Sequence, residues 1–245
     1  MRNADQWTPS KYVMRGGTLR ASADTNQVAV GSRLAAELSA ARYQKYLPEH
    51  ATGRLLDLGC GSVPLFGVYR EHVTEVVTLD WNESPHARHH VDVLHDLNQP
   101  LPFSDGEFDT VVLSDVLEHV CEPGQLCAEI ARVLSPGGQL IGSAPFLYWI
   151  HEAPHDFFRY TEFGLRHLLE SSELQIEVLD AMGGSFEIWA DLLAKHLAQA
   201  GPPGRALAAV LQSIVVSFGK TPPGRALSRR SSTRFALGCF FVASR

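Results

Sequence analysis

Residues 55–61, Leu-Leu-Asp-Leu-Gly-Cys-Gly, constrain the fold of this chain more than any other stretch. A short apolar run that ends in two glycines predicts a buried parallel strand, a tight turn and the start of a helix. Glycine is needed where the backbone turns sharply or where a ligand approaches it closely. Asp57 lies at the end of this strand, and Asp80 ends the next apolar run. An acidic side chain at that second place suits a bidentate grip on the two hydroxyls of a ribose.

The rest of the chain alternates between predicted strands and helices. The predicted strands lie at 54–58, 75–79, 90–93, 108–113, 139–143, 174–180 and 235–242. Helices are predicted from Pro64, over 123–134 and over 161–171, where Thr161 and Glu162 suit a first turn. This alternation predicts an α/β fold with a doubly wound parallel sheet, whose ligands bind beyond the carboxyl ends of the strands.

The first fifty residues precede this alternation. Residues 1–25 are polar and are interpreted as an irregular arm. The arm is either a frayed terminus or a lid. The lid is an alternative because the aromatic side chains of this otherwise polar segment can be buried against the rest of the protein. A helix is predicted from about 25 to 47, with Asp24 at its cap and Pro48 at its end.

More than fifty residues separate the last two predicted strands. Helices are predicted at 184–199 and 204–219, and the hexapeptide Pro-Pro-Gly-Arg-Ala-Leu occurs at 202–207 and 222–227. Both copies are interpreted as turns that launch a helix. This insert either packs on its own domain or serves as a homodimer contact, an acceptor lid or a membrane-surface contact. The predicted organisation is an arm and covering helix at 1–50, a core at 51–182, a helical insert at 183–234 and a closing strand at 235–245.

Composition narrows the classes of partner and compartment. The formal net charge of −6 argues against nucleic acid as the main partner, because phosphate binding usually shows as a basic face. Four cysteines show neither metal-ligand spacing nor a disulfide framework, so a reduced, cytoplasmic compartment is expected. The start has no signal-peptide core, and no run approaches the roughly 20 apolar residues of a membrane span. His89, His90 and His95 are irregularly spaced and no carboxylate cluster completes them, so no metal site is predicted.

The glycine stretch together with Asp80 resembles motif I of class I S-adenosylmethionine (SAM)-dependent methyltransferases. The dinucleotide fingerprint would need a third glycine, and Pro64 occupies that position. Residues 92–97 are similar to the family's third motif, residues 108–120 to its fourth and residues 132–138 to its turn into the fifth strand. The resemblance covers roughly residues 50–182. It implies a seven-stranded Rossmann-like methyltransferase sheet with an N-terminal helical cap, in which 235–242 is the closing antiparallel strand.

The same resemblance implies SAM as cofactor and S-adenosylhomocysteine as product. In this family the third motif receives the adenine, and the fourth motif lies beside the methionine part of SAM. The cofactor-binding residues it implies are Asp57, Gly59, Gly61, Asp80, Trp81, Asp96, Leu97 and Ser114. Two alternatives stay open for neighbouring residues: Asp96 caps a turn, and Glu118 with His119 either begins a helix or faces the cleft.

The segment 145–161 follows the fifth predicted strand and is dense in aromatic residues, which is typical of a pocket-forming loop. It resembles the H-x-x-P-x-D-[FY]-x-R-[FY]-T segment of a bacterial methyltransferase subgroup often found near glycan and secondary-metabolite genes. Histidine titrates nearest neutrality, so a histidine paired with a carboxylate suits a general base. The predicted catalytic residues are His151, His155 and Asp156, with His151 favoured as the base. The predicted acceptor-binding residues are Tyr12, Tyr148, Trp149, Arg159 and Tyr160. The alternative is a structural brace, in which Asp156 pairs with Arg159 and the rings fill core.

The sequence thus predicts a SAM-dependent methyltransferase that acts on oxygen or nitrogen of a small-molecule acceptor, such as a secondary metabolite or a sugar-like compound. One rival function is an enzyme that uses SAM differently, by intramolecular displacement on its aminobutyryl chain, and releases methylthioadenosine. The other rival is a non-catalytic SAM-binding or scaffold protein.

Overall fold

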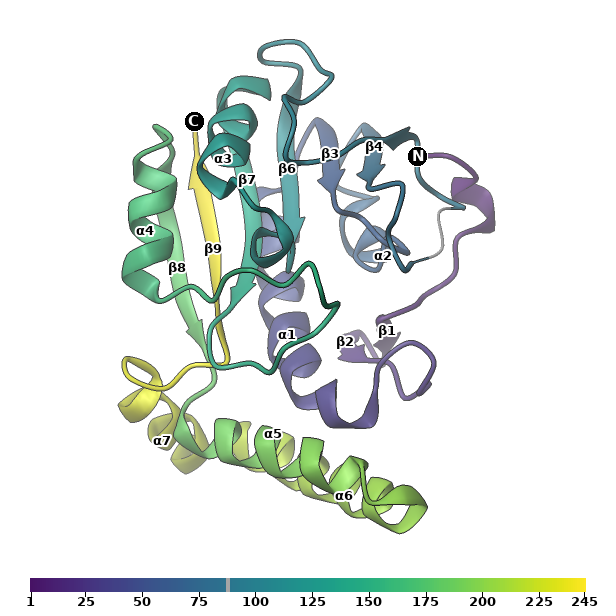
Figure 1. Ribbon diagram of the computed structural model, residues 1–245, viewed down its shortest axis with the longest axis vertical. Helices are drawn as coiled ribbons and strands as arrows, with labels where there is room; N and C mark the ends of the chain where they lie inside the picture. The colour runs from purple at the N-terminus through teal and green to yellow at the C-terminus, as the bar shows by residue number, and fades with distance from the viewer. Residues whose placement is uncertain (87–88) are drawn as a thin grey trace.

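Seven strands form one sheet in the computed structural model, which describes residues 1–86 and 89–245 (Figure 1). Their order is β5-β4-β3-β6-β7-β9-β8, and every neighbouring pair is parallel except the two that involve β9. The strands are β3 (Arg54–Leu58), β4 (Glu75–Asp80), β5 (Val93–Leu94), β6 (Phe108–Ser114), β7 (Leu134–Pro145), β8 (Gln175–Met182) and β9 (Gly238–Ser244). The strand order reverses between β3 and β6, and ligands of such sheets bind at this reversal.

The predicted α/β fold and its seven-stranded sheet are confirmed. Leu55, Leu56 and Leu58 of β3 are all fully buried, as expected for a parallel strand that is covered on both faces. The strand predicted at 90–93 was misplaced, because only Val93–Leu94 pairs with β4. Asp92 instead accepts the Thr78 amide N–H with its side chain at 3.0 Å, which replaces regular pairing there.

Helices cover both faces of the sheet (Figure 1). On one face α3 (Pro123–Val133) and α4 (Glu162–Glu170) bury Ile130 and Leu165 against Phe241 of β9 and its neighbours. The hydroxyl of Thr161 caps α4 by accepting the Gly164 amide N–H at 3.1 Å, which agrees with the predicted start of this helix. On the other face lie α1 (Arg33–His50) and the short α2 (Phe66–Tyr69), with a second apolar core.

The predicted bounds of the first helix were wrong at both ends. Asp24 caps a local turn rather than the helix, since its carboxylate accepts the Asn26 amide N–H at 2.9 Å. A 3-10 turn, η2 (Val30–Ser32), leads into α1 at Arg33. Pro48 lies inside the last turn, where the chain stays helical because the Ala51 amide still donates to the Leu47 carbonyl at 2.8 Å.

The N-terminal arm is ordered, so its description as irregular was wrong. After a 3-10 turn, η1 (Ala4–Gln6), it forms a hairpin of β1 (Tyr12–Arg15) and β2 (Thr18–Ala21). Trp7 packs edge-on against Phe66 of α2 at 5.4 Å and donates its indole N–H to the Val63 carbonyl at 3.0 Å. These contacts hold the arm against the core, which excludes a frayed terminus.

The insert consists of α5 (Ser185–Ala198), α6 (Gly201–Gly219) and α7 (Pro222–Ser232), which lie below the carboxyl ends of the strands (Figure 1). Each copy of the repeated hexapeptide opens a helix, as predicted, and its glycine meets a carbonyl oxygen so closely that a Cβ would lie 2.1 Å or 2.0 Å away. Gln212 of α6 accepts the Leu34 amide N–H at 2.6 Å, so the insert packs on its own domain. Among the described residues, no helix combines the length and the apolar character needed to cross a membrane.

Phe240 tests how far the fold depends on β9. Its ring stacks on Tyr46 and meets Tyr43 edge-on, each at 5.2 Å between centroids, and it is fully buried. We expect Phe240→Ala to lower the free energy of unfolding by about 3–5 kcal/mol, measured by urea denaturation with circular dichroism. The control Phe163→Ala, at a side chain that is 77% exposed, should change it by less than about 0.5 kcal/mol. Similar values for the two variants would contradict the assigned core.

Candidate functional site

A cavity of about 830 Å³ opens where the strand order reverses, at the carboxyl ends of β3, β4, β6 and β7. The arm, the glycine turn and the loop after β7 form its walls. It is lined by all eight predicted cofactor residues: Asp57, Gly59, Gly61, Asp80, Trp81, Asp96, Leu97 and Ser114. It is also lined by Glu118, His119, Tyr148, His151 and His155. The fold therefore brings the predicted cofactor side and part of the predicted acceptor side into one space.

The glycine turn has a backbone geometry that other residues rarely adopt. Gly59 has a φ of +62°, and a Cβ there would lie 2.6 Å from the Cγ2 atom of Val116. The amide of Cys60 donates to the Leu79 carbonyl at 3.1 Å, which ties the turn to the end of β4. These two restraints explain why the first glycine is needed there.

Asp80 holds the second end of this turn. Its Oδ2 accepts the Gly61 amide N–H at 2.8 Å and the Ser84 hydroxyl at 3.2 Å, while Oδ1 accepts the Trp81 amide N–H at 2.7 Å. An ionised carboxylate has about four acceptor positions, so Oδ1 keeps capacity for one further hydroxyl. The carboxylate is therefore fixed in place and still able to bind a ligand.

Asp57 lies beneath the turn and braces it. Its Oδ2 accepts the Tyr69 hydroxyl at 2.7 Å. Burial raises the pKa of Asp57 to about 7, although the hydrogen bond from Tyr69 works in the opposite direction. Asp96 caps a turn, as one alternative predicted, because its Oδ1 accepts both the backbone and side-chain N–H groups of Asn98. It also lines the cavity, and its predicted role in cofactor binding stays a prediction.

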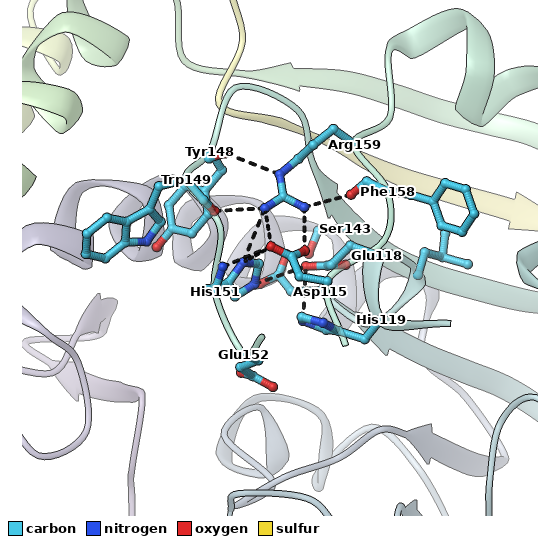
Figure 2. Close-up of polar contacts among 12 residues, drawn as sticks. Asp115, Glu118, His119, Ser143, Tyr148, Trp149, His151, Glu152, Phe158 and Arg159 are labelled. Carbon is cyan, nitrogen blue, oxygen red and sulfur yellow. Dashed lines mark hydrogen bonds and ion pairs between the residues drawn. The ribbon is translucent and has the colours of Figure 1, made fainter. Parts of the chain in front are cut away.

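A buried carboxylate and two imidazoles meet on the opposite wall (Figure 2). Glu118 is 0% exposed, and within the described part of the chain neither of its oxygens has a hydrogen-bond partner. Its Oε1 lies 3.6 Å from Nε2 of His151 and 3.8 Å from Nε2 of His119. Burial raises the pKa of Glu118; burial also lowers the pKa of His151, but the adjacent Glu118 more than offsets this and raises it. The structure thus decides the open alternative: Glu118 faces the cleft.

Asp156 and Arg159 form a brace behind His151, as the structural alternative predicted. Arg159 donates to both Asp156 oxygens at 2.6 Å and 2.7 Å, and to the carbonyls of Tyr148 and Trp149 at 3.2 Å and 2.8 Å. This pairing lowers the pKa of Asp156 to about 2. The same carboxylate accepts the His151 amide N–H at 2.9 Å and lies 3.5 Å from its Nδ1. Asp156 therefore orients His151 without lining the cavity.

The other predicted acceptor-side residues divide into two groups. Tyr148 lines the cavity, with its hydroxyl donating to Ser32 at 2.9 Å, and His155 lines it beside Trp81, with 4.8 Å between ring centroids. Four residues lie outside the described lining and have supporting positions instead: Tyr12, Trp149, Arg159 and Tyr160. Tyr160, for example, is buried and donates its hydroxyl to the Leu117 carbonyl at 3.0 Å.

Lys11 is a cavity residue that sequence reasoning missed. Its Nζ lies 3.0 Å from Oδ2 of Asp115, a residue with a φ of +54° after β6, and the Ser143 hydroxyl donates to the other oxygen at 2.7 Å. Burial would raise the pKa of Asp115, but Lys11 and Ser143 lower it below its ordinary value. The two partners are 104 residues apart, so no local pattern could have shown the pair.

The raised pKa of Asp57 predicts that the difference in stability between Asp57→Asn and the original chain depends on pH. An unfolded Asp titrates near pH 4, whereas folded Asp57 titrates at about 7, so this carboxyl weakens folding progressively as the pH rises between those values. Asp57→Asn keeps an acceptor for Tyr69 and removes the ionisation. Its melting temperature relative to the original chain should therefore rise between pH 5 and pH 8, measured by calorimetry. A difference that is constant with pH would contradict the raised pKa.

Comparisons with known proteins agree with this geometry. Residues 56–142 match the family model described as a methyltransferase domain. The chain is 36% identical to a malonyl-[acyl-carrier protein] O-methyltransferase of Herminiimonas arsenicoxydans, over 48% of this chain and 47% of the relative. It is 31% identical to a demethylmenaquinone methyltransferase of Renibacterium salmoninarum, over 47% of this chain and 49% of the relative. The chain thus spans about half the length of these curated relatives.

A solved SAM-dependent methyltransferase from Mesorhizobium loti shares the fold. The TM-score is 0.56 at 17% identity, over 86% of this chain and all of the other. The sheet order and the glycine turn agree with these likenesses. Residues 56–142 are similar to the methyltransferase-domain family, and the chain shares the fold of that solved SAM-dependent methyltransferase.

Proposed function

We propose that this protein transfers the methyl group of SAM to an oxygen or nitrogen atom of a small molecule. The observation that supports this most directly is the shared cavity, which the glycine turn with Asp80 lines on one side and Glu118, His119 and His151 line on the other. A volume of about 830 Å³ lies in the upper part of the range for ligand sites, which suits a nucleoside ligand together with a second molecule.

The cofactor side fits SAM in its chemistry. Asp80 keeps acceptor capacity on Oδ1 for a ribose hydroxyl, and the glycine turn leaves the backbone open to close approach. Asp96 and Leu97 line the same cavity and are the residues proposed to receive the adenine. Bound SAM supplies a methyl group that its positively charged sulfur already activates.

The protein then has to position the acceptor in line with the methyl group, exclude water and remove a proton. Positioning alone accounts for much of the rate of such a transfer. For a hydroxyl acceptor, His151 and His155 are the proposed proton acceptors because both line the cavity. Asp156 positions His151 through its amide and Nδ1, and Tyr148 is the proposed ring contact for the acceptor. An amine acceptor would need these side chains only for binding.

A small-molecule acceptor is supported by one of the two relatives named above and by the enclosure of the site. The demethylmenaquinone methyltransferase named above acts, by its name, on a small molecule. The arm packs over the cavity and contributes Ser10 and Lys11 to its lining, which encloses the space around a compact ligand. The chemical identity of the acceptor follows only from a screen.

The assigned cofactor site predicts a specific loss of affinity in Asp80→Asn. The variant keeps the size of the side chain but removes its charge, and hydrogen bonds to a charged group contribute about 1.5–3 kcal/mol. We expect SAM affinity by calorimetry to fall roughly 10- to 100-fold, since 1.4 kcal/mol corresponds to tenfold. The control Asp105→Asn changes an exposed carboxylate before β6, outside the cavity lining, and should bind SAM like the original chain. Unchanged affinity in Asp80→Asn would reject the assigned site.

The SAM-derived by-product separates the proposal from its two rivals. The protein is incubated with SAM and a panel of phenols, sugars and amines, and the products are identified by mass spectrometry. Methyl transfer predicts S-adenosylhomocysteine in equal amount to a methylated acceptor. Methylthioadenosine would instead indicate intramolecular displacement, and SAM binding without any product would indicate a binding protein.

A further inference from the structure

We propose that Glu118, His119 and His151 bind a divalent first-row metal cation, which holds the oxygen of the acceptor. The role in methyl transfer rests on the proposed function, whereas cation binding itself does not. This site differs from the histidines considered in the sequence: His89, His90 and His95 bond separately to Gln6, Arg2 and Pro100.

The three side chains have the spacing of a metal site. One ligand atom from each lies within 4.8 Å of the others. Glu118 and His119 belong to the 3-10 turn η3 (Leu117–His119) that follows β6, and His151 belongs to the loop that follows the adjacent β7. Ligands about 2.0–2.2 Å from a shared cation lie roughly 3–3.5 Å apart. The separations are 3.6 Å and 3.8 Å from Glu118 to the imidazoles and within 4.8 Å for the whole set, so the side chains have to close by up to about 1 Å around a cation.

The buried carboxylate points independently to a ligand. Glu118 is 0% exposed, and among the described residues both oxygens lack a hydrogen-bond partner. Burying a carboxylate without hydrogen bonds is costly, and buried charges are generally paired or bound to a metal. Its Oε1 faces the two imidazoles at the cavity wall (Figure 2).

A hydrogen bond fixes the tautomer of His119 and directs its free lone pair toward Glu118. Nδ1 of His119 lies 2.6 Å from the His155 carbonyl, which can only accept, so Nδ1 carries the proton and Nε2 is free to ligate. Metal-bound histidines usually donate their second N–H to a carbonyl or carboxylate in this way. Nδ1 of His151 lies at ion-pair distance, 3.5 Å, from the Asp156 carboxylate.

Arg159 also contacts the imidazole of His151. Its Nη2 donates to Nδ1 at 3.5 Å, and it donates to Asp156 at 2.7 Å and to the Trp149 carbonyl at 2.8 Å. With Nδ1 as an acceptor, Nε2 of a neutral His151 carries the proton and faces Glu118. A cation bound between Glu118 and the two imidazoles takes the place of this proton, because metal binding releases protons from its ligands.

Two imidazoles and one carboxylate favour Mn²⁺, Fe²⁺, Co²⁺ or Zn²⁺ over Ca²⁺, which prefers oxygen ligands. Three protein ligands leave positions on the cavity side for an acceptor hydroxyl, whose pKa the cation lowers. During transfer the acceptor oxygen forms a bond to the methyl carbon, the carbon–sulfur bond breaks and its electron pair stays on sulfur. The hydroxyl proton leaves to His155 or to solvent, because His151 is then a ligand.

The test uses the full chain, stripped with EDTA and titrated with Mn²⁺ under electron paramagnetic resonance. We expect one Mn²⁺ per chain, at least tenfold weaker binding in Glu118→Gln and in His151→Gln, and unchanged binding in His167→Asn, the control at an exposed histidine of α4. Pulsed spectra of the unaltered chain should show imidazole nitrogen coupled to Mn²⁺, which keeps the test valid if a variant fails to fold. Equal binding by the original chain and Glu118→Gln, without nitrogen coupling, overturns the site and leaves a proton shared by Glu118 and His151.

Assays of methyl transfer distinguish this inference from the proposed function. Removal of metal should lower methyl transfer to an oxygen acceptor at least tenfold and leave SAM affinity unchanged, and Mn²⁺ should restore the rate. Transfer that persists after EDTA would overturn the role of the cation but not the methyltransferase proposal. Specific Mn²⁺ binding without any transfer would reject the methyltransferase proposal and retain the metal site.

Discussion

The hydrogen bond from the Gly61 amide to the Asp80 carboxylate is the contact on which the proposed cofactor site depends. It joins the turn after β3 to the end of β4, so two neighbouring parallel strands present one rigid edge to the cavity. A turn held only by its own glycines would be free to close. Because Gly59 cannot carry a Cβ beside Val116, the turn is also restrained from behind. The edge is therefore preorganised before any ligand binds.

The proposed acceptor side, around Glu118 and His151, contains a buried carboxylate whose hydrogen-bonding capacity is still available. Among the residues that the structure describes, the side chain of buried Glu118 has no hydrogen-bond partner, whereas Asp156 and Arg159 are joined by two hydrogen bonds. The hydrogen-bonded pair of Asp156 and Arg159 fixes the loop after β7. The Glu118 carboxylate in front of this pair can still accept hydrogen bonds from a ligand or bind a cation. Different residues of the loop therefore have different roles. Arg159 holds the loop backbone through the carbonyls it contacts, and His151 lines the cavity.

The insert lies near the edge of the sheet where the parallel strands end (Figure 1), and the cavity opens at the carboxyl ends of these strands. Lys195 of α5 is buried, ion-paired with Asp191, and its Nζ lies 4.0 Å from the ring centroid of Tyr148. The insert therefore supports a residue of the cavity wall from outside. The insert also exposes apolar side chains, such as Trp189, which is 73% exposed. These side chains are compatible with the predicted homodimer contact, which stays a prediction.

The sequence by itself determined the sheet and the glycine turn with Asp80, because those features are local. Buried parallel strands appear as short apolar runs, and the glycine turn with Asp80 lies within one strand–helix–strand unit. Only the tertiary structure decided the bounds of α1, the ordered arm, and the meeting of Lys11 with Asp115 and of Glu118 with His151. Those contacts join side chains that are 33 to 104 residues apart, or depend on a surface against which a polar segment packs. Local patterns carry no information about such partners, since packing brings them together only after the chain has folded.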